Sequence, residues 1–151
     1  MLKLVRTNSE NKDFINMVKQ LYCYLKITDG DEHEFYNQFN SISVLKHVVI
    51  AYLNEEPVGC GAFKRFSKKD AEVKRMFTSK GVRGKGIASK VLIELEDWAH
   101  LLNYDTLILE TGIRQKEAVQ FYKKNSYQII PNYGQYVGLK NSLCFQKIIK
   151  Q

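Results

Sequence analysis

The sequence predicts an α/β fold in which helices cover both faces of one mixed β-sheet. In the first half, runs rich in β-branched residues follow one another across short polar turns, which is typical of an antiparallel meander. In the second half, strands alternate with amphipathic helices, which is typical of a strand–helix–strand unit. The length of 151 residues fits one domain, so residues 1–151 are expected to form a single unit.

The chain should begin with a short strand over residues 2–6 and a helix over 10–26. Asn8 and Ser9 are residue types that cap helices, and apolar residues then recur at helical spacing. These apolar residues are Phe14, Ile15, Val18, Leu21, Tyr22 and Leu25. A polar turn follows, and a second helix is expected over 31–40.

The meander is predicted from three strands over residues 47–53, 58–66 and 71–78. Polar turns separate them, and β-branched residues are frequent in the first. Gly59 and Gly61 interrupt the middle strand, which indicates that another element approaches its backbone closely.

The second half should contain helices over 84–102 and 115–124, because apolar residues recur there every three or four positions. Strands are expected over 106–110, 127–130 and 143–149. The antiparallel meander would then join a β-α-β-α unit within a mixed sheet.

The charge balance indicates an anionic partner. Lys and Arg number 23 against 16 Asp and Glu, giving a formal net charge of +7. Nucleic acid, an anionic membrane and a phosphorylated small molecule are the candidate partners, and solubility alone is the plainer alternative. Neither a stretch near ~20 apolar residues nor a signal-peptide pattern occurs, so we expect a cytoplasmic protein without a membrane partner. A dense basic group comprises Lys74, Arg75, Lys80, Arg83, Lys85 and Lys90.

The cysteines and histidines do not show a metal or disulfide pattern. Cys23, Cys60 and Cys144 are odd in number and widely spaced. We therefore expect buried or half-buried thiols, with no disulfide framework and no metal site.

A glycine-rich loop over residues 83–88 connects a predicted strand to a predicted helix. Gly84, Gly86 and Ala88 would let a ligand approach the backbone, where loop amides and a helix N-terminus favour anions. Arg83 and Lys85 would add mobile positive charge. An ordinary turn is the alternative, whereas the spacing excludes a Walker A loop and a dinucleotide fingerprint.

Together with two downstream motifs, this loop resembles the GNAT superfamily of N-acetyltransferases. Residues 83–88 match that family's acetyl-CoA motif, Gln/Arg-x-x-Gly-x-Gly/Ala. Residues 109–112 end the next strand, where the family splays two parallel strands. Residues 118–127 resemble Ala-x-x-Phe/Leu-Tyr-x-Lys-x-Gly-Phe/Tyr, with Ser126 replacing the usual glycine. The resemblance covers nearly the whole chain and implies the GNAT-type acyl-CoA N-acyltransferase fold.

The resemblance also implies acetyl-CoA as the cofactor and direct attack by the acceptor, without an acyl-cysteine. Backbone groups of Met76, Phe77 and Thr78, beside a strand bulge, would hold pantetheine and polarise the thioester carbonyl. Tyr122 matches the family tyrosine that faces the sulfur and would protonate the leaving thiolate. The other implied cofactor contacts are Arg83, Gly84, Lys85, Gly86, Ile87, Ala88, Ser89, Thr111, Gln115 (where many members have asparagine), Ala118, Phe121 and Lys124.

A general base is needed because a primary amine, pKa ~10.4, is almost entirely protonated at neutral pH. Glu72 occupies a strand position where family members often carry a base, and Glu110 on the facing strand is the second candidate. Glu72 could equally be an exposed strand residue that pairs with Lys74.

The acceptor is expected to contact two polar, aromatic segments. The first contributes Glu32, His33 and Tyr36, and the second contributes Tyr133 and Tyr136. The predicted function is N-acetylation of a small or amino-acid-like amine by a monomer or homodimer, without a nucleic-acid partner. Alternatives are acetylation of a protein N-terminus or lysine, a non-catalytic CoA-binding module, and a basic nucleic-acid binder.

Overall fold

The computed structural model describes residues 1–29 and 45–150. The helix predicted over 31–40 lies outside the described residues, as do the acceptor candidates Glu32, His33 and Tyr36. The described elements are β1 (Leu2–Thr7), α1 (Lys12–Asp29), β2 (His47–Leu53), β3 (Glu56–Arg65), β4 (Asp70–Thr78), η3 (Lys80–Val82), α3 (Ile87–Leu101), β5 (Thr106–Gly112), α4 (Lys116–Lys124), β6 (Gln128–Ile130), η4 (Gly134–Tyr136) and β7 (Ser142–Ile148).

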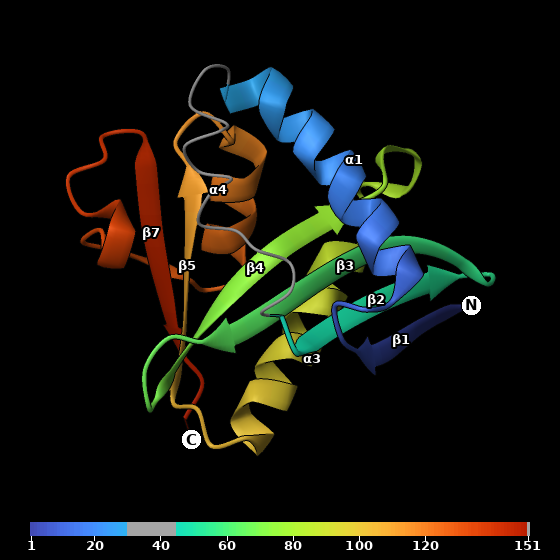
Figure 1. The fold of residues 1–151 in the computed structure, drawn as a ribbon, viewed down its shortest axis with the longest axis horizontal. Coiled ribbons are helices and arrows are strands. Elements are labelled where there is room, and N and C mark those ends of the chain that lie inside the picture. Colours follow the sequence, from blue (N-terminus) through green and yellow to red (C-terminus); the bar gives the residue numbers. More distant parts are fainter. Residues whose placement is uncertain (30–44, 151) are drawn as a thin grey trace.

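All the described strands form one mixed sheet, which confirms the predicted α/β class. The seven strands lie in the order β1-β2-β3-β4-β5-β7-β6 (Figure 1). Every neighbouring pair is antiparallel except β4 and β5, which are parallel. The meander β2-β3-β4 is therefore joined to the C-terminal strands through a single parallel pair.

Helices cover both faces of the sheet. This follows from β2, whose consecutive apolar side chains point to opposite faces, so that both faces must be buried. Val48 and Ile50 pack with Phe14 of α1 in one buried cluster. Val49 packs on the opposite face, in the cluster that contains Val91 of α3 and aromatic residues of α4. Helix α1 therefore lies on one face, and α3 and α4 lie on the other (Figure 1).

Helix α3 begins at Ile87, three residues later than the sequence predicted. Gly84 and Gly86 have φ angles of 83° and 77°, which a right-handed helix cannot contain. The glycine-rich segment is therefore a loop that leads into the helix.

Strand β4 carries the bulge expected beside Met76. Its pairing with β3 shifts between Cys60 and Ala62, and Arg75 has a φ of 60°. A Cβ on Gly61, opposite the bulge, would collide with the Met76 sulfur, so the predicted close approach is confirmed. The Cys60 thiol donates a hydrogen bond to the Arg75 carbonyl at 3.4 Å, which helps hold the distorted backbone.

The cysteines are all free thiols, but their environments differ from the prediction. Cys60 and Cys144 are buried, whereas Cys23 is exposed because it lies on the solvent side of α1. Within residues 1–29 and 45–150, none of the helices combines the length and apolar character that crossing a bilayer requires.

Candidate functional site

The site lies where β4 and β5 separate. The two strands pair only from Asp70 opposite Thr106 to Glu72 opposite Ile108. Beyond that point they diverge, as Figure 1 shows, while β5 stays paired with β7 as far as Gly112. A cavity of about 470 Å³ opens between them and is also lined by α1, the glycine-rich loop and α4. Its walls therefore come from both halves of the chain.

The glycine-rich loop closes one end of this cavity. A Cβ on Gly84 or Gly86 would meet no atom within 4 Å, so the space beside the backbone is open. The first turn of α3 follows at once, and its amide groups favour an anion there. Loop and helix terminus together fit a pyrophosphate group.

The two charged side chains of the loop, Arg83 and Lys85, lie in different surroundings. Arg83 is held in place because its Nε donates to the Thr78 carbonyl at 3.1 Å and its guanidinium lies 5.5 Å from the centre of the Tyr24 ring. Its charge therefore lies at the cavity wall. Lys85 is exposed and does not line the cavity.

The other predicted cofactor residues meet at the cavity, although they come from four different segments of the chain. Met76, Phe77 and Thr78 belong to β4, and Thr111 belongs to β5. All the predicted residues except Lys85 line it, namely these four and Arg83, Gly84, Gly86, Ile87, Ala88, Ser89, Gln115, Ala118, Phe121, Tyr122 and Lys124.

Tyr122 projects from α4 into the cavity wall. Its ring packs against Tyr127 and Phe145, with centroid distances of 5.8 Å in both cases, and the residue is only 6% exposed. Burial, and secondarily the negative charge of Glu110, raise the pKa of the Tyr122 phenol above its ordinary value. The hydroxyl therefore stays protonated at neutral pH and is a proton donor.

The two candidate bases lie in different surroundings. Glu110 lines the cavity. Glu72 does not line it and is 1% exposed, so an exposed Glu72 is ruled out. Its carboxylate accepts a hydrogen bond from the Tyr133 hydroxyl at 2.6 Å and lies 3.5 Å from the Lys74 ammonium, which confirms the expected pairing with Lys74.

The segment after β6 supplies one cavity residue of the two that were predicted. Tyr136 is 2% exposed and lines the cavity, and its hydroxyl accepts a hydrogen bond from the Lys74 ammonium at 3.1 Å. Tyr133 is directed to Glu72 and is not part of the lining. Both contacts fasten this segment to the start of β4.

The sequence placed the acceptor beside the first helix pair but did not indicate which residues of α1 form a wall of the cavity. Tyr22, Tyr24 and Leu25 line it. Tyr22 and Leu25 belong to the apolar repeat of the helix, which predicts burial but cannot distinguish a core face from a cavity wall. Nor did the sequence show that Lys74 and Arg75 turn into the cavity.

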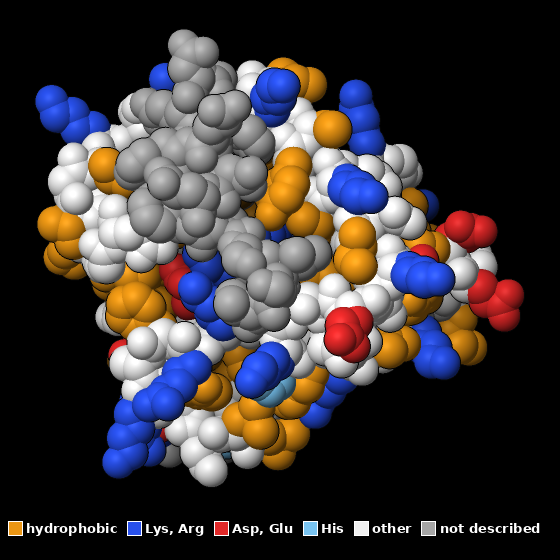
Figure 2. Space-filling model, viewed as in Figure 1, with side chains coloured by type: hydrophobic (Ala, Val, Ile, Leu, Met, Phe, Trp, Pro, Cys, Tyr) orange, Lys and Arg blue, Asp and Glu red, His pale blue; other side chains and the backbone are white. Residues whose placement is uncertain are grey.

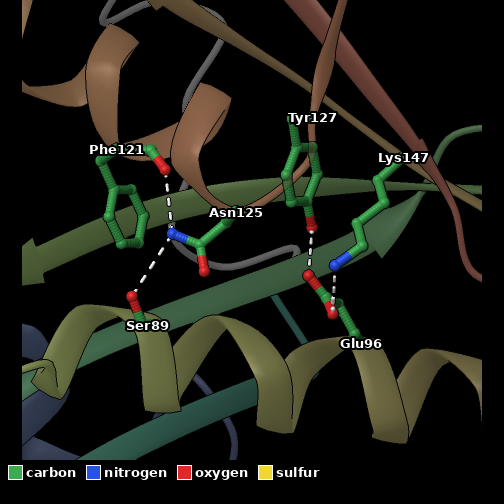
Figure 3. Close-up of polar contacts among 6 residues, drawn as sticks. All are labelled: Ser89, Glu96, Phe121, Asn125, Tyr127 and Lys147. Carbon is green, nitrogen blue, oxygen red and sulfur yellow. Dashed lines mark hydrogen bonds and ion pairs between the residues drawn. The ribbon is translucent and has the colours of Figure 1, made fainter.

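The walls formed by α3 and α4 are tied together by side-chain contacts (Figure 3). The Asn125 amide donates to the Ser89 hydroxyl at 3.3 Å and to the Phe121 carbonyl at 2.9 Å. Farther along α3, Glu96 accepts hydrogen bonds from Tyr127 at 2.9 Å and from Lys147 at 3.1 Å. The Asn125 contacts tie the end of α4 to the first turn of α3, and the Glu96 contacts tie Tyr127 and β7 to the middle of α3.

The basic group predicted around the loop is divided by the fold. Lys74, Arg75 and Arg83 line the cavity, whereas Lys80 and Lys90 are exposed outside it. Figure 2 shows other Lys and Arg side chains scattered over the described part of the α1 face without forming one continuous patch. The excess charge is therefore concentrated only in part at the cavity.

Comparison with known families identifies the fold. The family model described as "Acetyltransferase (GNAT) family" matches residues 14–127. The chain belongs to this family, and the GNAT-type fold expected from the sequence is confirmed.

Two curated relatives carry acetyltransferase names. The IAA acetyltransferase of Azospirillum brasilense is 35% identical over 80 residues, which cover 52% of this chain and 52% of that protein. The Uncharacterized N-acetyltransferase YsnE of Bacillus subtilis (strain 168) is 31% identical over 99 residues, covering 64% and 66% respectively. The matched stretch thus spans between half and two thirds of these relatives.

Solved structures show the same fold along almost the whole chain. A Klebsiella pneumoniae protein assigned to the acyl-CoA N-acyltransferases has a TM-score of 0.83 and 25% identity, covering 99% of this chain and 98% of that one. The PaiA N-acetyltransferase of Thermoplasma acidophilum, solved with coenzyme A, has a TM-score of 0.73, 14% identity and coverages of 98% and 99%. At that identity the second likeness concerns the fold alone.

Proposed function

We propose that residues 1–151 work as one domain that transfers the acetyl group of acetyl-CoA directly to the primary amine of a small-molecule or amino-acid-like acceptor. The observation that carries this proposal is the cavity between the diverging ends of β4 and β5. It is closed at one end by the Gly84–Gly86 loop and lined by a buried phenol, Tyr122, and a carboxylate, Glu110.

Acetyl-CoA fits the residues present. The open space beside Gly84 and Gly86 would accept the pyrophosphate, and the separated edges of β4 and β5 leave room for an extended pantetheine arm. When bound, acetyl-CoA supplies an acetyl group activated as a thioester. Acetyl-CoA or CoA binding by relatives with this fold agrees with the assignment.

Tyr122 would act as the general acid. Its raised pKa keeps the proton on the oxygen through the neutral range, so that it can be donated to the sulfur of the leaving group. Backbone groups of the β4 bulge would donate to the acetyl oxygen, where negative charge develops.

Glu110 is the better placed base. An amine with a pKa near 10.4 is neutral in only about one molecule in a few thousand at pH 7, so the enzyme must remove a proton. Glu110 lines the cavity opposite β4, whereas Glu72 does not line it, is 1% exposed and is bound to Tyr133 and Lys74. We therefore assign Glu110 to proton removal and Glu72 to holding Lys74 in place.

Two measurements test the function. Acetyl-CoA should raise the melting temperature and protect residues 83–89 from hydrogen exchange, and release of the CoA thiol should depend on an added amine. A panel of amino acids, polyamines, aminoglycosides and peptides then defines the acceptor. Stabilisation by acetyl-CoA without thiol release for any amine would favour a non-catalytic CoA-binding module, and peptide-only turnover would favour a protein acetyltransferase.

The assignment of the base is tested by pH profiles. Glu110→Gln should lower kcat/KM about 100-fold or more at neutral pH. The deficit should shrink toward pH ~10, where the amine loses its own proton. Glu72→Gln is the matched variant, and it should leave that pH dependence intact. The reverse pattern would make Glu72 the base.

Cytoplasmic location, the monomeric or dimeric state and the absence of a nucleic-acid partner stay predictions. The name of the Azospirillum relative refers to IAA, and we include this compound in the acceptor panel for that reason.

A further inference from the structure

Two consecutive cationic side chains of β4 lie on the same face of the sheet. In a regular strand they would point to opposite faces. Val73 lies in the α3-side cluster, so Lys74 points to the α1 side. Arg75 should then return to the α3 side, but its φ of 60° turns it toward α1, where its guanidinium lies 5.5 Å from the centre of the Tyr22 ring. The bulge thereby adds a second cation to the α1 side.

Both cations are buried and both line the cavity. Lys74 is 8% exposed and Arg75 is 7% exposed. Burial lowers the pKa of each side chain, which shows that the surroundings disfavour their charge. An apolar side chain would pack against the Tyr22 ring without that desolvation penalty. The two cations therefore place positive charge at the cavity wall, where the anionic group of a ligand can reach it.

The positive and negative groups of the cavity lie on opposite walls. Lys74 and Arg75 belong to β4, and Glu110 belongs to β5 after the two strands have diverged. The Arg75 guanidinium lies against the Tyr22 ring of α1, whereas Glu110 lines the cavity from β5. Arg75 and Glu110 therefore lie on different walls of the cavity.

This separation matches a ligand that carries an amine and an anion. We infer that the acceptor is a carboxylate-bearing amine of the amino-acid type, whose amine reaches Glu110 and whose carboxylate binds Arg75 beside Lys74. A guanidinium suits this role because its planar donors match the two oxygens of a carboxylate. The inference rests on the proposed acetyltransferase function and narrows its substrate class.

Matched acceptor pairs test the inference. Each amino acid is compared with the amine that decarboxylation would leave, for example tyrosine with tyramine and histidine with histamine, and kcat/KM is measured by thiol release. The carboxylated member should be preferred about 10- to 100-fold, as one charge-assisted contact would produce.

Substitutions at Arg75 show which side chain is responsible. Arg75→Met keeps an unbranched, flexible side chain but removes its charge, so both members of a pair should react within about twofold of each other. Arg75→Lys restores a charge without the planar donors and should retain part of the preference. Lys19→Met is the matched control, because Lys19 is exposed on α1 and outside the cavity, and it should change nothing.

Folding and cofactor binding are checked separately. Melting temperature and acetyl-CoA affinity should be the same for wild type, Arg75→Lys and Lys19→Met. If Arg75→Met does not fold, the comparison of Arg75→Lys with wild type carries the test.

Three results would overturn the inference. They are equal or faster turnover of the decarboxylated amines, a preference that stays as large as in wild type in the Arg75 variants, and no turnover of any carboxylated amine. Turnover of amines that lack a carboxylate would in these cases leave the acetyltransferase function standing. Absence of acetyl-CoA binding would overturn both proposals.

Discussion

Replacing Tyr122 with phenylalanine separates the chemistry of the hydroxyl from the packing of the ring. The ring contacts with Tyr127 and Phe145 do not involve the hydroxyl, so Phe can keep them. Among the described residues, the hydroxyl has no hydrogen-bond partner to lose. The free energy of unfolding should therefore change by no more than about 0.5 kcal/mol.

The effect on catalysis should be large. Loss of a positioned proton donor typically lowers the rate about 100- to 10,000-fold, equivalent to about 2.7–5.5 kcal/mol of transition-state stabilisation. Acetyl-CoA affinity should stay nearly unchanged because the loop and the strand edges are intact. The assay combines kcat from thiol release, affinity from calorimetry and stability from urea unfolding.

Tyr127→Phe is the matched control. Tyr127 is equally aromatic and buried, but its hydroxyl donates to Glu96 and does not line the cavity. Its removal should lower stability by about 1.5–3 kcal/mol, or about 3–10 °C in Tm, with kcat preserved. The reasoning is refuted if Tyr122→Phe keeps its turnover, or if it loses affinity or stability in proportion to its loss of rate.

The remaining predictions concern the backbone of the site and its response to alkali. Ser126 has a φ of 73° in place of the family's glycine, so Ser126→Gly should stabilise the protein by about 0.5–1 kcal/mol in urea unfolding, whereas Ser126→Ala should not. Gly84→Ala, at a φ of 83°, should destabilise by about 1–2 kcal/mol and weaken acetyl-CoA binding about tenfold or more, and Gly81→Ala, which has open space and no positive φ, should do neither. Burial raises the pKa of several tyrosines above 10.0, so native protein holds protons that unfolded protein releases above that pH. The contribution of these tyrosines to stability should be constant below about pH 9 and fall above pH 10 by up to ~1.4 kcal/mol per pH unit for each tyrosine. Phenolate absorbance should then appear together with unfolding. Phenolate absorbance that rises near pH 10 in folded protein would contradict this. The tyrosines concerned are Tyr122, Tyr127, Tyr133 and Tyr136.

The local pattern of the chain was sufficient to predict most elements within a few residues. Helix α1, for example, ends three residues later than expected, at Asp29, and β7 begins one residue earlier, at Ser142. Such boundaries depend on neighbours in space as well as on sequence. The late start of α3 follows from the positive φ angles of Gly84 and Gly86. The sequence motif shows that small residues are needed in this loop, but it does not show their backbone conformation.

The candidate base shows why the site could not be completed from sequence. Glu72 and Glu110 both lie on strands that border the site, and strand periodicity treats them alike. Only the divergence of β4 and β5 after Glu72 places Glu110 at the cavity. The hydroxyl of Tyr133, 61 positions farther along the chain, donates a hydrogen bond to the Glu72 carboxylate. Contacts of such long range leave no periodic signal.

By itself, the sequence determined the order of the elements, the glycine-rich loop and the position of Tyr122 on its helix, because each depends on residues close together in the chain. The tertiary structure decided which wall each charge occupies. Arg75 faces the cavity because a bulge opposite Gly61 reverses its direction, and Tyr136 reaches Lys74 because β5 and β7 pair beside β4. These placements depend on register between distant strands, which is fixed only when the sheet packs against its helices.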